Sequence, residues 1–361
     1  MKTRVIISVT NEISYDQRML KTATTLVNNG FTVRIIGRNK EEKNDYPPQP
    51  GDIEFHRFSL FFNKGKFFYL EYNLRLLFYL IFNFADIYCA VDLDTILPNL
   101  LVSRLKGKPL IYDAHEYFTE VPELQGRGLE KAIWKWVERL AIPLCDKIYT
   151  VSDGIASLFS KEYFKEVEVI QNLPRKFTRD TQSRKENIIL YQGDLNEGRG
   201  LELAIKAMDS LENYTLWIAG GGYFEFELKS LALKNRHPER IIFLGKLSPM
   251  DLKNKTLSAK FGLNLLENKG LNYYNSLANK FFDYLQSGVI PISMNFPEYS
   301  ALNERYHCAL LIDSLDIHQF INTLELAEKN YPNLLKNVDI AASFLTWESE
   351  EEKLCSIYKN V

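Results

Sequence analysis

Short apolar runs alternate with amphipathic segments along most of the chain. In the first half, β-rich runs of strand length occur at residues 4–9, 32–36, 53–57, 86–90, 110–113, 147–151 and 168–170. Most of the intervals between these runs have a helical pattern, such as residues 16–28, which lead to Gly30 as a helix end. Strands separated by helices predict a parallel, doubly wound sheet, because parallel strands need a crossover connection.

A second alternating set follows the polar, poorly periodic segment QNLPRKFTRDTQSRKEN at residues 171–187. Its predicted strands are 188–192, 215–219, 241–244, 261–266, 289–293 and 309–312, with helices near 201–211 and 225–234. Residues 347–358 read as an acidic amphipathic helix.

The pattern therefore predicts an α/β protein with two Rossmann-like, doubly wound domains that face a cleft. We expect an N-terminal domain over 1–170, a linker over 171–187, a C-terminal domain over 188–345 and a last helix over 346–361. A ligand is expected in the cleft, at the carboxyl ends of the strands of both sheets.

Composition narrows the class of protein further. The 361 residues carry a formal net charge of −2, which argues against a nucleic-acid-binding protein. The four cysteines are isolated from one another, so neither a disulfide framework nor a zinc site is indicated, and a cytoplasmic protein is expected. No stretch approaches the roughly 18 uncharged residues needed to span a bilayer.

The most informative segment is residues 259–293, which predicts strand, polar loop, short helix, glycine and strand. Asn275 or Ser276 is the predicted N-cap, so Ser276, Lys280 and Asp283 would share one helix face. The helix N-terminus and Lys280 suit a phosphate, and Asp283, about 10 Å further along, suits ribose hydroxyls. An ordinary amphipathic helix packed through its phenylalanines is the alternative.

The run SLANKFFDYLQSGVIPI at 276–292 resembles the donor-site helix of GT-B glycosyltransferases similar to glycosyltransferase family 4. The resemblance implies that Asp283 holds the ribose of a nucleotide sugar. The usual pattern has a second acid eight positions earlier, where this chain has Asn275, as some bacterial members do. We expect Asn275 and Ser276 to belong to the donor site.

The loop YQGDLNEGRGL at 191–201 follows a strand that ends at Gly193. By the same resemblance, Arg199 contacts the donor diphosphate, and a planar guanidinium suits two phosphate oxygens. Arg199 is therefore the first candidate for stabilising the leaving group and Lys280 the second, with a solvated loop arginine as the alternative. The resemblance also implies that Lys246 and Leu247 lie near the nucleobase.

The run YDAHEYF at 112–118 ends another predicted strand. Bacterial members of the family have a similar Asp-x-His-Glu, which implies that His115 lies near the donor sugar and the acceptor, with Glu116 beside it. A histidine can donate a hydrogen bond to a sugar hydroxyl or polarise it at neutral pH. A structural histidine with satisfied hydrogen bonds is the alternative.

Acceptor binding is expected on the first domain. The loop at 10–18 contains Asn11, and Asp16 and Arg18 match an Asp-x-Arg of the bacterial subset, although the two could be a helix N-terminal pair. Asp92 and Asp94 could be mistaken for the Asp-x-Asp metal motif of GT-A glycosyltransferases. We expect Asp94 to face the acceptor instead, with no metal and no cofactor.

Residues 57–84 are dense in phenylalanine, tyrosine and leucine, with lysine and arginine interspersed. This composition suits a peripheral contact with the inner face of a membrane, where a lipid-linked acceptor would wait. A core helix that covers the sheet is the alternative.

The resemblance covers essentially the whole chain and implies a glycosyltransferase of GT-B architecture, whose C-terminal helix, here within 346–361, crosses back to pack on the N-terminal domain. The expected reaction moves a sugar from a UDP- or GDP-sugar to the hydroxyl of a saccharide or lipid-linked acceptor, with retention of configuration, in bacterial surface-polysaccharide or glycolipid synthesis. Two alternatives stay open at this point. They are a nucleotide-sugar 2-epimerase, which shares the GT-B architecture, and a non-catalytic partner of another transferase.

Overall fold

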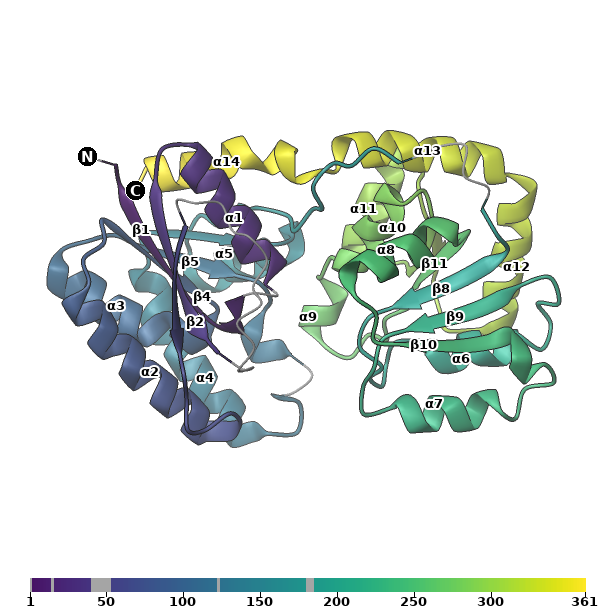
Figure 1. Ribbon diagram of the computed structural model, residues 1–361, viewed down its shortest axis with the longest axis horizontal. Coiled ribbons are helices and arrows are strands. Elements are labelled where there is room, and N and C mark those ends of the chain that lie inside the picture. The colour runs from purple at the N-terminus through teal and green to yellow at the C-terminus, as the bar shows by residue number, and fades with distance from the viewer. Residues whose placement is uncertain (1, 14–15, 40–52, 122–123, 180–184) are drawn as a thin grey trace. The chain divides into compact units, whose positions relative to one another are not determined.

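The computed structural model describes residues 2–13, 16–39, 53–121, 124–179 and 185–361 (Figure 1). The chain divides into two compact units. Unit 1 consists of Met1–Asn172 with Glu350–Val361, and unit 2 consists of Leu173–Ser349. Each unit is built on one parallel sheet with its own buried apolar core.

The sheet of unit 1 has the strand order β3-β2-β1-β4-β5-β6-β7, and every described pairing in it is parallel. Its central strands are fully buried because helices cover both faces, which explains their continuous apolar sequences. The strands are Arg4–Glu12 (β1), Thr32–Arg38 (β2), Ile53–Phe58 (β3), Ile87–Val91 (β4), Leu110–Ala114 (β5), Lys147–Thr150 (β6) and Glu168–Val169 (β7).

The helices of unit 1 follow the strands in turn. They are Gln17–Asn28 (α1), Gly65–Phe82 (α2), Ile96–Lys106 (α3), Gly128–Ala141 (α4) and Asp153–Tyr163 (α5), with short 3₁₀ turns at Leu93–Thr95 (η2), Phe118–Glu120 (η3) and Ile142–Leu144 (η5). The last helix, Trp347–Lys359 (α14), contacts α1 and the residues that follow it. There the Thr25 hydroxyl donates to Glu351, and the Phe31 and Tyr358 rings meet edge to face.

The sheet of unit 2 has the order β10-β9-β8-β11-β12-β13 and is also parallel throughout. Its strands are Ile188–Gln192 (β8), Thr215–Ala219 (β9), Ile241–Gly245 (β10), Phe261–Asn264 (β11), Ile290–Met294 (β12) and Leu310–Ile312 (β13). Its helices are Leu201–Ala207 (α6), Glu225–Ala232 (α7), Pro249–Ser258 (α8), Leu271–Tyr274 (α9), Asn279–Gln286 (α10), Pro297–Tyr306 (α11), Ile317–Lys329 (α12) and Tyr331–Phe344 (α13), with a 3₁₀ turn at Pro238–Arg240 (η6).

The predicted strands of both sheets are confirmed, with ends that move by a few residues at most. In each sheet the strand order reverses beside the first strand, between β1 and β4 in unit 1 and between β8 and β11 in unit 2. Ligands of open parallel sheets bind outside the carboxyl ends of the strands at such a reversal. The topology therefore predicts a ligand at the carboxyl edge of each sheet.

None of the described helices is long and apolar enough to cross a membrane. All four cysteines are buried and free.

Candidate active site

Two cationic side chains lie near the carboxyl ends of β8 and β11. Arg199 belongs to the loop between β8 and α6, and Lys280 belongs to the first turn of α10. Each cation lies over an aromatic ring. The Arg199 guanidinium carbon is 5.0 Å from the centre of the Tyr273 ring, and the Lys280 Nζ is 4.0 Å from that of the Tyr191 ring. These rings hold the cations in place without neutralising them.

The electrostatics of this edge favour an anion. Within the described part of the chain, no carboxylate forms an ion pair with Arg199 or Lys280, and the Arg199 Nε is buried without a hydrogen-bond partner. Burial and the nearby Arg199 lower the pKa of Lys280 to about 7. An anionic ligand would relieve both conditions, because it would accept from Arg199 and stabilise the charged form of Lys280.

Glycines bring the backbone close to this pair of cations. Gly193, the first residue after β8, has φ +134° and donates its amide to the Ala219 carbonyl at 3.0 Å. A Cβ at Gly193 would lie 3.1 Å from the Lys280 Nζ. A Cβ at Gly220 would overlap the Gly193 carbonyl, so the glycine run that follows β9 is required for the loops to pack.

Asp283 lies one turn after Lys280 on α10 and is partly buried. Its Oδ2 accepts a hydrogen bond of 3.1 Å from the Gln192 Nε2, and the Gln192 Oε1 accepts one of 2.9 Å from the Thr256 hydroxyl. Gln192 therefore fixes the carboxylate. Sequence reasoning missed Gln192, although its place as the last residue of a buried strand was a signal.

The predicted start of the donor-site helix is wrong. α10 begins at Asn279, with Ala278 as N-cap, so Ser276 is not on its face with Lys280. Asn275 is instead the C-cap of α9, where its Nδ2 donates to the Leu271 carbonyl, and the Ser276 hydroxyl donates to the Tyr273 carbonyl. Both side chains donate to carbonyls of the preceding short helix. Such hydrogen bonds to nearby backbone compete with the hydrogen bonds of an N-cap.

Lys246 and Leu247 follow β10 in the loop before α8. Lys246 is exposed, and its stem lies beside Gly221. Leu247 is partly buried against a small apolar cluster that includes Ala219 and Tyr284. Both residues thus lie at the same edge of the sheet as Arg199 and Lys280.

In unit 1 the Asp113 carboxylate organises the equivalent edge. It is fully buried at the end of β5 and accepts from the Arg18 Nη2 at 3.0 Å and from the Tyr149 hydroxyl at 2.9 Å. The His115 Nε2 is 3.2 Å from the same carboxylate. Tyr358 of α14 contacts the Tyr149 hydroxyl, so the C-terminal helix helps to close this network.

This network holds His115 as a cation. Burial alone would lower the pKa of His115, but the Asp113 and Asp92 carboxylates raise it to about 9. Burial alone would raise the pKa of Asp113, but Arg18 and His115 lower it to about 2. His115 is partly exposed, so its other ring nitrogen can donate to a ligand. Asp113 was part of the quoted motif, yet its role depends on Arg18, which is remote in sequence.

Asp92 and Asp94 lie just after β4, at the strand reversal. Asp92 has φ +53°, a strained conformation for a residue with a side chain, and its Oδ1 accepts from the His115 amide at 2.9 Å. Asp94 is buried and accepts from the Thr10 hydroxyl at 2.6 Å. Burial raises the pKa of Asp94 to about 6. Among the described residues, no group of three or more His, Cys, Asp or Glu could hold a metal ion.

The other acceptor-side candidates take different places. Asn11 is exposed and donates to Asp16, which is the N-cap of α1. Arg18 is buried and donates to Asp113 and to the Ile170 carbonyl, so it supports the His115 network. Glu116 is partly exposed, and the pKa of Asp92 is raised first by burial and then by the charge of Glu116.

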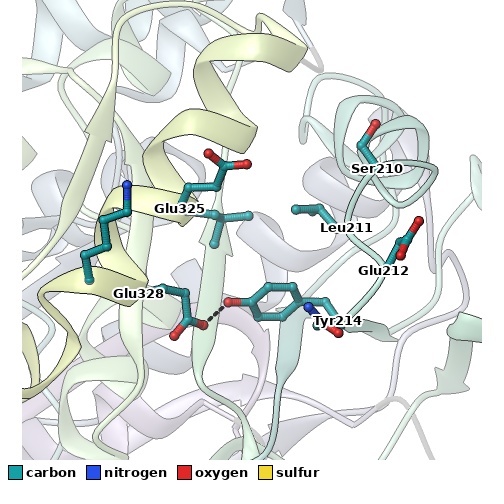
Figure 2. Close-up of a pocket in the computed structure, with 9 residues that line it drawn as sticks. Ser210, Leu211, Glu212, Tyr214, Glu325 and Glu328 are labelled. Atoms are coloured by element: carbon teal, nitrogen blue, oxygen red, sulfur yellow. Dashed lines mark hydrogen bonds between the residues drawn. The ribbon is translucent and has the colours of Figure 1, made fainter.

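A separate hollow of about 340 Å³ lies between the start of β9 and α12 (Figure 2). The Tyr214 hydroxyl donates to Glu328 there, and Glu325 and Glu212 also line it. Because Tyr214 precedes β9, this hollow is at the amino edge of the sheet, away from Arg199 and Lys280. It does not belong to the candidate site.

Comparisons with known proteins indicate the family of the chain. The family model for glycosyl transferases group 1 matches residues 174–343, and the model for glycosyltransferase family 4 matches residues 17–173. No curated protein matches the chain. The two family models together cover both units.

Several solved structures have the same fold at low identity. Sucrose-phosphate synthase from Thermosynechococcus elongatus is 14% identical, with a TM-score of 0.80 over 99% of each chain. WaaG, a glycosyltransferase involved in lipopolysaccharide biosynthesis, is 16% identical, with a TM-score of 0.73 over 98% of this chain and 99% of that chain. Anabaena Alr3699/HepE in complex with UDP-glucose is 10% identical, with a TM-score of 0.74 over 99% of this chain and 100% of that chain.

The fold and the family models define a class of α/β enzymes, the GT-B glycosyltransferases. The chain belongs to the members of this class that are similar to glycosyltransferase family 4, and it is a glycosyltransferase. The predicted family and fold class are therefore confirmed.

Proposed function

We propose that this enzyme transfers a hexosyl or related group from a UDP- or GDP-sugar to a hydroxyl of a saccharide or lipid-linked acceptor. One observation carries the proposal. Arg199 and Lys280, neither paired with a described carboxylate, lie together at the strand reversal of unit 2 beside the Gly193 backbone. A diphosphate is the part of such a donor that this arrangement suits.

The proposed chemistry breaks the bond between the anomeric carbon of the sugar and the diphosphate oxygen. It forms a bond from the same carbon to the oxygen of the acceptor hydroxyl, whose proton passes to the departing diphosphate. Negative charge then grows on the departing diphosphate, where Arg199 and Lys280 stabilise it. Asp283, fixed by Gln192, accepts from the ribose hydroxyls. His115 donates a hydrogen bond to a sugar hydroxyl from the ring nitrogen that does not face Asp113. Retention of configuration and independence from metal ions are part of the proposal.

The rest of the proposal concerns the nucleotide and the acceptor. The Anabaena relative was solved with UDP and with UDP-glucose, which supports UDP as the first nucleotide to test. We place the enzyme in bacterial surface-polysaccharide or glycolipid synthesis, at the inner face of the membrane. Residues 57–84 would then lie near a lipid-linked acceptor.

A thermal-shift panel of UDP, GDP, ADP and CDP, each with and without EDTA, tests the donor site. A ligand that binds only the folded protein raises its apparent stability as its concentration passes the Kd. We expect one clear stabilising nucleotide that is insensitive to EDTA. Stabilisation that EDTA abolishes would contradict metal independence, and no stabilisation by any nucleotide would contradict the donor site.

The matching nucleotide sugars should then be incubated with the enzyme, with and without a saccharide or lipid-linked acceptor, and the anomeric configuration of the product read by NMR. Conversion of the free donor into an epimer without acceptor would show a nucleotide-sugar epimerase instead.

A further inference from the structure

The outer side of α2 is apolar where a surface helix is normally polar. Its inner side packs into the core of unit 1 through residues spaced four apart, Phe68, Tyr72, Leu76 and Leu80. Its outer side carries a second apolar stripe, made of Phe67, Leu70, Leu74, Phe78 and Ile81. The helix is therefore apolar on both sides although only one side is covered.

The next two helices of the same layer repeat this arrangement. α3 packs against α2 and against α4, on one side of the sheet (Figure 1). The outward residues of α3 are Leu97, Leu101 and Leu105, and those of α4 are Leu129, Ile133, Trp136 and Leu140. These residues and the α2 stripe, here called the apolar face, are between 37% and 75% exposed.

An apolar face that spans three neighbouring helices is unusual for a surface that meets only water. Single exposed apolar residues are common, but contiguous patches mark contacts with proteins or membranes. The spacing on each helix is three or four residues, so the exposed side chains form stripes along the helix axes. The exposed apolar residues are therefore arranged along the helices, as in helices that lie in a membrane interface, and are not scattered single positions.

The charges around the apolar face indicate which surface it meets. Residues 64–82, 96–108 and 127–141 contain ten lysine and arginine residues against three glutamates, in a chain whose net charge is −2. Five of these cations, Arg75, Lys108, Lys131, Lys135 and Arg139, are paired with carboxylates. Lys64, Lys66, Arg104 and Arg127 have exposed side chains, and no described carboxylate forms an ion pair with them. Basic residues with exposed phenylalanine, tryptophan and leucine are the composition of helices that lie in the interface of an anionic bilayer.

We propose that the apolar face of α2, α3 and α4 docks on an anionic lipid bilayer, with its lysines and arginines against the headgroups. A contact between two copies of this face is disfavoured, because a two-fold contact would set the same cationic surface against itself. The contact extends the proposed role of residues 57–84 to α3 and α4. It does not depend on the sugar-transfer reaction, since lipid binding and nucleotide binding are measured separately.

The location of the apolar face in unit 1 would bring the membrane close to the edge of the sheet that carries His115. Helices of a parallel α/β sheet run against the strands, so α2, α3 and α4 begin at the edge where β4 and β5 end. Lys64, Lys66 and Arg127 lie at these helix starts, and His115 follows β5 at the same edge. A bilayer held there would present the headgroup of a lipid-linked acceptor on the side of unit 1 that carries His115.

Vesicle flotation of the full chain tests the proposal. The probes are vesicles of phosphatidylcholine alone and of phosphatidylcholine with about one third phosphatidylglycerol. We expect binding to the anionic vesicles that is at least about tenfold stronger than to the neutral ones and that weakens in about 1 M salt. No binding to anionic vesicles, or equal binding to both, would overturn the proposal.

Matched variants locate the contact. Leu101→Ser with Trp136→Ser removes apolar side chains from α3 and α4 only, and should weaken vesicle binding by about tenfold or more. The control is Phe226→Ser with Leu233→Ser, two exposed positions in the α7 region of unit 2, which should leave binding unchanged. Lys64→Glu with Lys66→Glu should weaken binding to anionic vesicles by about tenfold. The control is Lys234→Glu with Arg236→Glu in unit 2, which should leave that binding unchanged.

Trp136 reports insertion directly. Its fluorescence should shift to shorter wavelength on anionic vesicles, and Trp136→Phe should remove that shift. Light scattering of the free protein tests the competing explanation, a dimer through the apolar face. A dimer that disappears in the Leu101→Ser, Trp136→Ser variant would show that a second copy covers the face and would overturn the proposal. Nucleotide stabilisation of every variant, measured in parallel, separates loss of membrane binding from loss of the donor site.

Discussion

The strand order of the two sheets reverses at the same place, beside the first strand, but their carboxyl edges carry opposite chemistry. In unit 2 that edge presents Arg199 and Lys280, with no described carboxylate paired to either. In unit 1 the same edge presents Asp92, Asp94 and a histidine whose charge is held by Asp113. The topology thus sets where a ligand binds, and the side chains set its charge. A diphosphate suits the first edge, and neutral hydroxyls suit the second.

The largest effect is expected at Arg199. Because it stabilises charge that grows on the leaving group, Arg199→Ala should lower kcat by about 10²–10³, as loss of one oxyanion donor does. Arg236→Ala, an exposed arginine of the same unit, is the control and should leave kcat unchanged. Both variants should unfold within about 2 °C of the parent in a thermal scan. If Arg199→Ala has the kcat of the parent, or loses stability as well as activity, Arg199 does not stabilise the leaving group.

The next effect concerns the charge of His115. Its pKa of about 9 lies above the ordinary value of about 6.5, so its proton stabilises the fold fully below pH 6.5 and that contribution is lost as the pH rises through 9. Activity should fall over the same alkaline limb. Asp113→Asn should move the midpoint of the His115 NMR titration down by about 2 pH units.

Tyr149→Phe removes a hydrogen bond from Asp113 but keeps its charge, so His115 should still titrate near pH 9 in that control. Asp113→Asn also leaves the buried Arg18 unpaired, at a cost of about 3–5 kcal/mol of stability. If Asp113→Asn does not fold, the NMR titration of His115 in the parent protein is the test. A parent His115 that titrates near its ordinary value would contradict the network.

A smaller effect is expected at Asp283, and it separates ribose from phosphate. Asp283→Asn should weaken nucleoside diphosphate binding by about tenfold, the cost of one charge-assisted hydrogen bond. Inorganic pyrophosphate has no ribose, so its affinity should not change. Calorimetric titration measures both. Equal weakening of the two ligands would show that Asp283 acts on the diphosphate or on the fold of α10.

The fold was predictable because both sheets are buried on both faces. Strands such as β5 and β12 are continuous apolar runs bounded by polar loops, so length and composition identify them without an alternating pattern. The start of α10 was not predictable in the same way. Asn275 and Ser276 have N-cap chemistry, but their hydrogen bonds go back to α9, and a sequence pattern does not choose between these partners.

The candidate site was predictable where one short segment carries the chemistry. Lys280 and Asp283 share one helix, and Arg199 follows one strand. The support of His115 was harder to see, because Arg18 reaches Asp113 only once β1 and β5 are placed in the same sheet. The apolar face was also hidden. The sequence of α2 fits a core helix and a membrane-facing helix equally. The structure packs its inner side into the core, and the exposure of its outer stripe could not be derived from the sequence.

The central claim is that Lys280 and Arg199 bind the donor diphosphate, and proton uptake on binding tests it most directly. Lys280 has a pKa of about 7, so at pH 8 its amine is mostly neutral, and a bound diphosphate should raise that pKa and draw in a proton. Titration calorimetry of the stabilising nucleotide at pH 8, in two buffers with different ionisation enthalpies, measures this uptake. We predict uptake of up to about one proton, which Lys280→Met abolishes. Binding without proton uptake, or uptake that survives in Lys280→Met, would contradict the claim.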